Sequence, residues 1–201
     1  MAETDVHAKL MIELRAALAD HFRTDPKVYV SGNLLLYYEE GNPHKCVAPD
    51  VFVVRGAPNH ERRVYLLWQE GQPPSVVFEI SSRGTYKEDL QRKWLLYAQL
   101  GVAEYYLYDP EYDYLKGGLM AYRPGDEGEY VEAPVNGGVI HSPALGLDIV
   151  DTGKTLRLRD SQTGQFLPTR AELQEAAAQA EDRATRLAAK LRELGVDPEQ
   201  V

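Results

Sequence analysis

The sequence has 201 residues and a net charge of −9, with 44% hydrophobic and 26% charged residues, as in globular proteins and unlike disordered or fibrous ones. No apolar run approaches the roughly 20 residues of a membrane helix, and the acidic N-terminal stretch lacks a signal peptide's basic region, so we expect a cytoplasmic protein without membrane partners. The acidic excess disfavours nonspecific binding to nucleic acid, although an acidic metal site can lie beside a locally basic groove.

The first predicted element is an amphipathic helix over residues 5–23. Leu10, Leu14 and Leu18 recur at helical spacing and define its apolar face. Residues 27–39 follow with β-branched and aromatic side chains around a Ser-Gly pair. This pattern is typical of two short strands or of one strand with a bulge.

Two further strands are predicted in the next part of the chain. Residues 47–56 form a short strand that opens with Pro49 and Asp50. Residues 74–81 are too short for a helix and apolar on both faces, so we expect a central strand there. Glu79 interrupts this apolar run. A buried carboxylate is costly unless a cation lies nearby, so Glu79 needs a partner.

A second helix is predicted over residues 86–100, with Gly101 as its natural stop. Another strand, 102–110, follows it, and the short apolar segments of residues 114–158 are typical of antiparallel strands or hairpins. The order of elements predicts an α/β or α+β fold in one domain, residues 1–168.

Residues 169–201 differ in kind from the rest of the chain. Thr169 and Glu172 form a capping-box pattern, and we expect the helix that they open to close at Gly195. Apolar residues then alternate at spacings of four and three, which indicates a coiled-coil-like appendage. This seam could pack on its own domain or on a second copy in a homodimer, and both remain open. Its members are Leu173, Ala177, Ala180, Ala184, Leu187, Leu191 and Leu194.

Two carboxylates are candidate metal ligands. Asp50 opens one predicted strand and Glu79 lies in the next, and neighbouring strands are only about 4.8 Å apart. Magnesium is commonly held by one or two carboxylates together with water and phosphate oxygens. Lys93 lies in the following helix, four residues after Asp89, and can turn its ammonium group back toward the strand end.

The motifs in this region resemble those of the Uma family of restriction endonuclease-like proteins, in the PD-(D/E)XK nuclease superfamily. The resemblance runs from about residue 7 to 158, and rests on VAPDVFVV followed by PSVVFEISSRGTYKEDLQRKWLLYAQLGVAEYYLYDP. It implies a restriction endonuclease-like core, in which a mixed sheet is flanked by helices, with extra β-hairpins. It also implies a magnesium- or manganese-dependent endonuclease acting on DNA.

Carried over by position, the resemblance makes Asp50 and Glu79 the metal ligands. The superfamily's usual lysine would stand at Ser81, so its role is expected to fall to Lys93 as the third catalytic residue. Arg83 and Asp89 are candidates for substrate binding, and Asp89 could also orient Lys93. His7 could approach the site, but a surface or helix-terminal role is the favoured interpretation.

Three hypotheses about the function remain open. The leading one is a metal-dependent endonuclease on DNA. The second is a weak or inactive nuclease fold that serves as a binding or assembly module through its C-terminal helix, and the third is an enzyme for another phosphodiester. The acidic net charge and Ser81 speak against the first.

Overall fold

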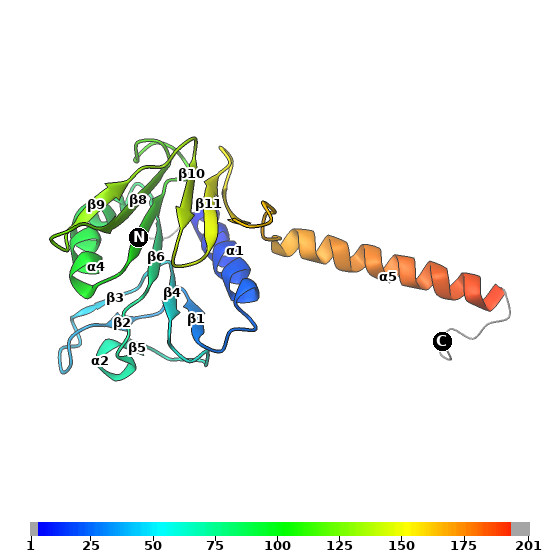
Figure 1. Cartoon of the computed structure of the whole chain (residues 1–201), viewed down its shortest axis with the longest axis horizontal. Helices are drawn as coiled ribbons and strands as arrows, with labels where there is room; N and C mark the ends of the chain where they lie inside the picture. Colours follow the sequence, from blue (N-terminus) through cyan, green and yellow to red (C-terminus); the bar gives the residue numbers. More distant parts are fainter. Residues whose placement is uncertain (1–3, 194–201) are drawn as a thin grey trace. The chain divides into compact units, whose positions relative to one another are not determined.

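The computed structural model describes residues 4–193 and divides into two compact units, Met1–Leu167 and Pro168–Val201. Figure 1 shows the first unit as strands and helices around a central sheet, and the second as one long helix. None of the helices within residues 4–193 is long and apolar enough to cross a membrane.

A six-stranded mixed sheet forms the centre of the first unit, in the order β1-β4-β6-β7-β8-β9. β6 and β7 run parallel, whereas every other neighbouring pair in this sheet is antiparallel. The predicted mixed sheet flanked by helices is therefore confirmed. Its strands are β1 (Val28–Ser31), β4 (Val51–Arg55), β6 (Val76–Ile80), β7 (Glu104–Tyr108), β8 (Leu119–Pro124) and β9 (Tyr130–Ala133).

Helix α1 (Asp5–His21) covers one face of this sheet. Thr4 caps its N-terminus by accepting a hydrogen bond from the His7 backbone, and Leu10, Leu14 and Leu18 pack on the strands. A three-stranded antiparallel sheet completes this layer, as the pattern of residues 114–158 predicts. Its strands are β10 (Val139–Ser142), β11 (Leu147–Asp151) and β12 (Leu156–Asp160).

The opposite face of the central sheet is covered by α4 (Trp94–Leu100) and a small sheet, β3-β2-β5 (Figure 1). Leu90, Trp94 and Tyr97 pack against this face, as their helical spacing predicts. The small elements are β2 (Leu36–Tyr37), β3 (Cys46–Val47), β5 (Tyr65–Leu66) and α2 (Leu67–Glu70).

The helix predicted over residues 86–100 consists of three consecutive segments. α3 (Tyr86–Glu88) leads into a π-helical turn, η1 (Asp89–Lys93), and α4 (Trp94–Leu100) follows. Gly101 ends α4 with a positive φ of 78°, which a glycine adopts without strain. Turns of π-helix are rare and often mark functional sites, and the periodicity of the sequence did not predict this one.

The second unit contains α5 (Arg170–Glu193). Its predicted capping box is present: the Thr169 backbone donates to Glu172 Oε2 over 2.7 Å, and the Glu172 backbone donates to Thr169 Oγ1 over 3.2 Å. The last predicted seam residue, Leu194, and the predicted stop at Gly195 lie outside the described residues.

Candidate active site

The two predicted metal ligands lie on neighbouring strands. β4 and β6 pair in antiparallel register with Val51 opposite Phe78, so Asp50, just before β4, comes next to Glu79 at the end of β6. Asp50 also bonds to β6 directly, because its Oδ2 accepts a hydrogen bond of 2.7 Å from the Ile80 backbone. The strand pairing thus holds both carboxylates at one end of the sheet.

Lys93 reaches the same place from the helical side. Its Nζ lies 2.9 Å from Glu79 Oε2 and 3.0 Å from Asp89 Oδ1. The helical segment η1 starts at Asp89 and ends at Lys93, and both side chains point toward the end of β6. The partner that Glu79 needs is therefore Lys93, as expected for a buried carboxylate.

Ser81 has a structural task at the position where the superfamily's lysine would stand. Its side chain is buried, and its Oγ donates a hydrogen bond of 3.1 Å to Asp89 Oδ2. Ser81 thus fixes Asp89, and Asp89 in turn holds the ammonium group of Lys93. Lys93 of the helical segment and Ser81, directly after β6, are thus linked through Asp89.

Asp89, the other candidate for substrate binding, is buried inside the cluster. The residue is 1% exposed, and its carboxylate is occupied by Ser81 and Lys93. Substrate binding by Asp89 stays a prediction, and the contact with Lys93 suits the alternative task of orienting that lysine.

Two further side chains belong to the cluster. Tyr97 donates a hydrogen bond of 2.6 Å to Glu79 Oε1, and His7 Nε2 lies 3.1 Å from Asp50 Oδ2. Tyr97 follows Lys93 by four residues, and this spacing is the signal that could have identified it. His7 is only 4% exposed, so it is not a surface residue, but it lies in the first turn of α1, as the helix-terminal part of the expectation states.

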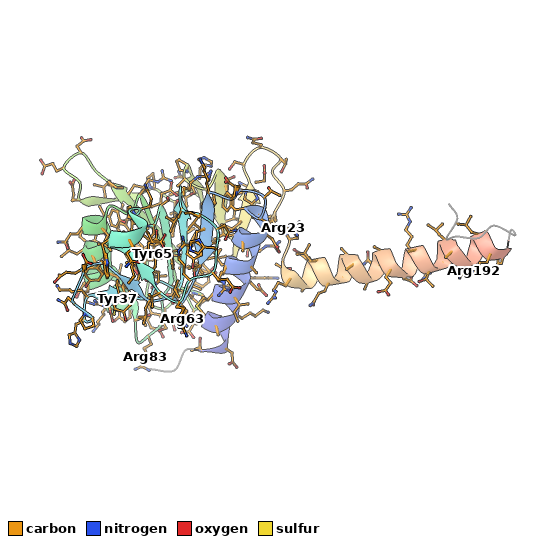
Figure 2. All side chains as sticks on the ribbon, turned by 90° about the horizontal axis from the view of Figure 1, so that it is seen from below. Arg23, Tyr37, Arg63, Tyr65, Arg83 and Arg192 are labelled. Atoms are coloured by element: carbon orange, nitrogen blue, oxygen red, sulfur yellow. The ribbon has the colours of Figure 1, made fainter. Side chains whose placement is uncertain are left out.

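Arg83 lies in the turn that follows β6. It is exposed at the outer edge of the first unit (Figure 2). Its predicted contact with a phosphate stays a prediction.

The balance of charge in the cluster is negative, because three carboxylates surround one ammonium group. Burial raises the pKa of Glu79 to about 8, with Asp50 and Asp89 adding to the rise and Lys93 opposing it. Burial likewise raises the pKa of Asp89. Burial would lower the pKa of Lys93, but Glu79 and Asp89 outweigh that effect and raise it, so Lys93 stays charged.

This charge balance fits a hard divalent cation. A carboxylate has about four acceptor positions, so Glu79 can bind a metal while keeping its bonds to Lys93 and Tyr97. Within residues 4–193, no group of three or more His, Cys, Asp or Glu side chains is arranged to hold a metal. Asp50 and Glu79 could supply two carboxylate ligands, a number that suits magnesium with water and phosphate oxygens.

The side chains of the cluster differ in how far they are exposed to solvent. The side chains of Asp50 and Lys93 are each 13% exposed, whereas those of Glu79 and Asp89 are 1% exposed. A substrate that approaches from solvent therefore meets Asp50 and Lys93 first.

Comparisons with known proteins agree with the resemblance seen in the sequence. Residues 1–152 match the model of the Uma2 family, which is described as "Putative restriction endonuclease". Among solved structures, a crystal structure of "a putative nuclease belonging to DUF820" from Anabaena variabilis is similar, with a TM-score of 0.52 and 16% identity. The match covers 72% of this chain and 76% of that one, and it confirms the fold class. No curated protein matches the sequence.

Proposed function

Because the chain belongs to the Uma2 family of restriction endonuclease-like proteins, a nuclease-like function is supported, and we propose a magnesium-dependent endonuclease that hydrolyses phosphodiester bonds in DNA. The observation that carries this proposal is the contact of Lys93 Nζ with Glu79, beside Asp50 at the same end of the sheet. Carboxylates that hold a cation, next to a lysine, are the parts that metal-assisted phosphodiester hydrolysis needs.

In this proposal Asp50 and Glu79 hold the metal, with manganese as an alternative to magnesium. The bound ion would lower the pKa of a water molecule and offset charge on the phosphate. Lys93 has three N–H donors, and its two carboxylate contacts leave one for a phosphate oxygen or for the attacking water. Its charge would stabilise the negative charge that develops in the transition state.

The surrounding residues act by positioning. Ser81 and Asp89 hold the ammonium group of Lys93, and Tyr97 orients the Glu79 carboxylate. Partners of metal ligands commonly tune metal affinity and activity in this way. Arg83, exposed in the turn after β6, would contact a phosphate of the same strand farther from the reaction.

The test is cleavage of supercoiled and linear DNA by the full chain in magnesium, in manganese and in EDTA. We expect cleavage that requires the metal and that falls at least about 100-fold in Asp50→Asn and Glu79→Gln. Glu127→Gln makes the same chemical change at an exposed position and serves as the control. Thermal melting followed by circular dichroism verifies that each variant is folded.

Wild-type activity that persists unchanged in Asp50→Asn would contradict the metal-site proposal. A folded wild type that binds DNA without cleaving it would favour the alternative, an inactive nuclease fold that serves as a binding or assembly module. Cleavage restricted to single-stranded, branched or RNA substrates would move the proposal to another phosphodiester.

We further propose that α5 joins two copies of the chain in a homodimer. Within its own unit no described residue of α5 is buried, and the seam residues Leu173 and Leu187 are 43% and 56% exposed. A lone helix of this length is only marginally stable in water, and an apolar seam gains stability by packing on a partner.

The mass of the full chain by light scattering tests this assembly. We expect a dimer that Leu187→Glu dissociates, because the change places a charge in the seam. Ala189→Glu puts the same charge at a position outside the seam and should leave the mass unchanged. A monomeric wild type at all concentrations would exclude the dimer.

A further inference from the structure

A polar hollow of about 490 Å³ opens between α1, the end of β1 and the loop before β5. Its volume falls within the range of roughly 300–1,000 Å³ that is typical of small-ligand sites. None of the residues proposed above for the chemistry lines it. The polar lining and the glycine beside it are Arg15, Ser31, Gly32, Asn59, His60 and Glu61.

The loop side of this hollow is held in place by Arg62. Its Nη1 donates to the backbone oxygens of Pro58 and His60, over 3.0 and 3.1 Å. Its Nε and Nη2 bind both oxygens of Glu70, and the guanidinium group lies 4.1 Å from the centre of the Tyr29 ring. The side chain of Arg62 is 2% exposed, so this arginine builds the wall and its charge is matched by Glu70.

The hollow itself presents groups that suit a nucleotide. Arg15 is exposed and forms no ion pair with any residue in the described part of the chain, so its charge is available to an anion. Asn59 can both donate and accept hydrogen bonds, and Glu61 accepts only. A phosphate needs a cation, and a base edge needs donors and acceptors of this kind.

Gly32 connects the hollow to the carboxylate cluster. A Cβ atom at this position would lie 2.3 Å from the Asp50 carbonyl oxygen, so the two backbones approach as closely as only glycine permits. The next residue, Asn33, donates from its backbone to the Pro49 carbonyl over 2.8 Å. One wall of the hollow is therefore in direct contact with the backbone that carries Asp50.

Helix α1 makes a second connection between the two places. His7 lies beside the Asp50 carboxylate, and Arg15 follows it on the same helix by eight residues, or about 12 Å. DNA rises by about 3.4 Å per nucleotide of one strand, so this distance corresponds to a few nucleotides.

We propose that this hollow holds one nucleotide of the substrate strand, a few positions from the bond to be cut, with Arg15 at its phosphate. The inference rests on the proposed nuclease function and adds a positioning site to it. Arg15 would then give the DNA a local positive contact on a protein whose net charge is −9.

The test compares Arg15→Ala with Lys9→Ala. Both remove one positive charge from an exposed position of α1, but Lys9 lies about 120° around the helix from Arg15. Binding of a fluorescent 20-base-pair duplex is measured in the Asp50→Asn background over a series of salt concentrations. Arg15→Ala should weaken binding about three- to tenfold and reduce the salt slope by about one, whereas Lys9→Ala should change neither.

Two further measurements separate this proposal from the proposed function. In steady-state cleavage, Arg15→Ala should raise KM more than it lowers kcat. In NMR titrations with a 5′-phosphorylated tetradeoxynucleotide, amide signals of residues 31–34 and 59–62 should shift, and this readout requires no catalysis.

The outcomes are distinct. If the wild type cleaves DNA and Asp50→Asn does not, while Arg15→Ala binds like Lys9→Ala, the hollow is not a nucleotide site and the nuclease proposal stands. If the NMR signals of the hollow shift but the wild type never cleaves, the nuclease proposal fails and the binding site stands. An absence of shifts with the tetradeoxynucleotide would also overturn the inference.

Discussion

Lys93 Nζ lies between two buried carboxylates, 2.9 Å from Glu79 Oε2 and 3.0 Å from Asp89 Oδ1. Each carboxylate is 1% exposed, so neither can be stabilised by bulk water when the lysine is removed. We therefore expect Lys93→Met to lower the free energy of unfolding by about 3–5 kcal/mol, the usual cost of a buried charge left without its partner.

Urea denaturation of Lys93→Met at pH 8.5 measures this cost, with Arg92→Ala as the control. Arg92 pairs with Glu88 on the exposed side of the same helical segment, where the two side chains are 57% and 44% exposed. Its loss should cost less than about 1 kcal/mol. Equal effects of the two substitutions would show that the buried ion pairs of Lys93 contribute no special stability.

Tyr97 supplies the other hydrogen bond to Glu79, over 2.6 Å. Tyr97→Phe should destabilise the protein by about 1–3 kcal/mol, because a buried acceptor loses its donor. If Glu79 holds the metal, cleavage should also fall about tenfold or more. Tyr114→Phe removes a hydroxyl that binds Glu111 at the surface, so it should change little. A Tyr97→Phe variant with the stability and activity of Tyr114→Phe would contradict this role.

The raised pKa of Glu79 predicts how stability depends on pH in EDTA. Its folded pKa is about 8, above the ordinary value of 4.5, so the folded state binds more protons than the unfolded state between these values. Stability should therefore fall as pH rises from 4.5 to 8, by up to about 1.4 kcal/mol per pH unit. Glu79→Gln lacks this titration, and the difference between the two unfolding curves isolates it. A difference that stays constant over this range would show that the pKa is not raised.

Gly32→Ala tests the close approach of two backbones beside the site. The added Cβ would lie 2.3 Å from the Asp50 carbonyl oxygen, so β1 or the start of β4 must move. We expect a loss of about 1–3 kcal/mol in thermal or urea unfolding, together with reduced cleavage because Asp50 moves. Gly41→Ala serves as the control. Gly41 has a φ of 78°, but no atom lies within 4 Å of the added Cβ, so this variant measures only the conformational cost of replacing a glycine, about 1 kcal/mol. If both variants lose the same activity, the loss in Gly32→Ala would not be caused by movement of Asp50.

Much of the fold could be predicted because local patterns and long-range packing agree in these elements. The helical spacing of Leu10, Leu14 and Leu18 predicts α1, and the continuous apolar run around Phe78 predicts a central strand. The pairing of Lys93 with Asp89 could be predicted from their spacing of four residues, and this pair is present. Its burial could not, because the same spacing is common in exposed helices.

The tasks of His7 and Ser81 could not be predicted from the sequence, for one physical reason. Each acts through a contact between different elements of the fold: His7 of α1 with Asp50 before β4, and Ser81 after β6 with Asp89 of η1. No periodicity within a single element encodes such contacts, and His7 is buried where a surface position was one of the expectations. The π-helical turn that begins at Asp89 likewise leaves no pattern in the apolar residues.

The sequence by itself determined the order of the elements, the presence of Glu79 within an apolar strand and the motifs of the family. These features depend on neighbours in the chain, through backbone propensity and the alternation of apolar and polar residues. Only the tertiary structure decided that Lys93 is the cation beside Glu79 and that Ser81 and Asp89 hold it there. Burial decides this, because a carboxylate removed from water must be matched by the charges and donors that folding brings to it.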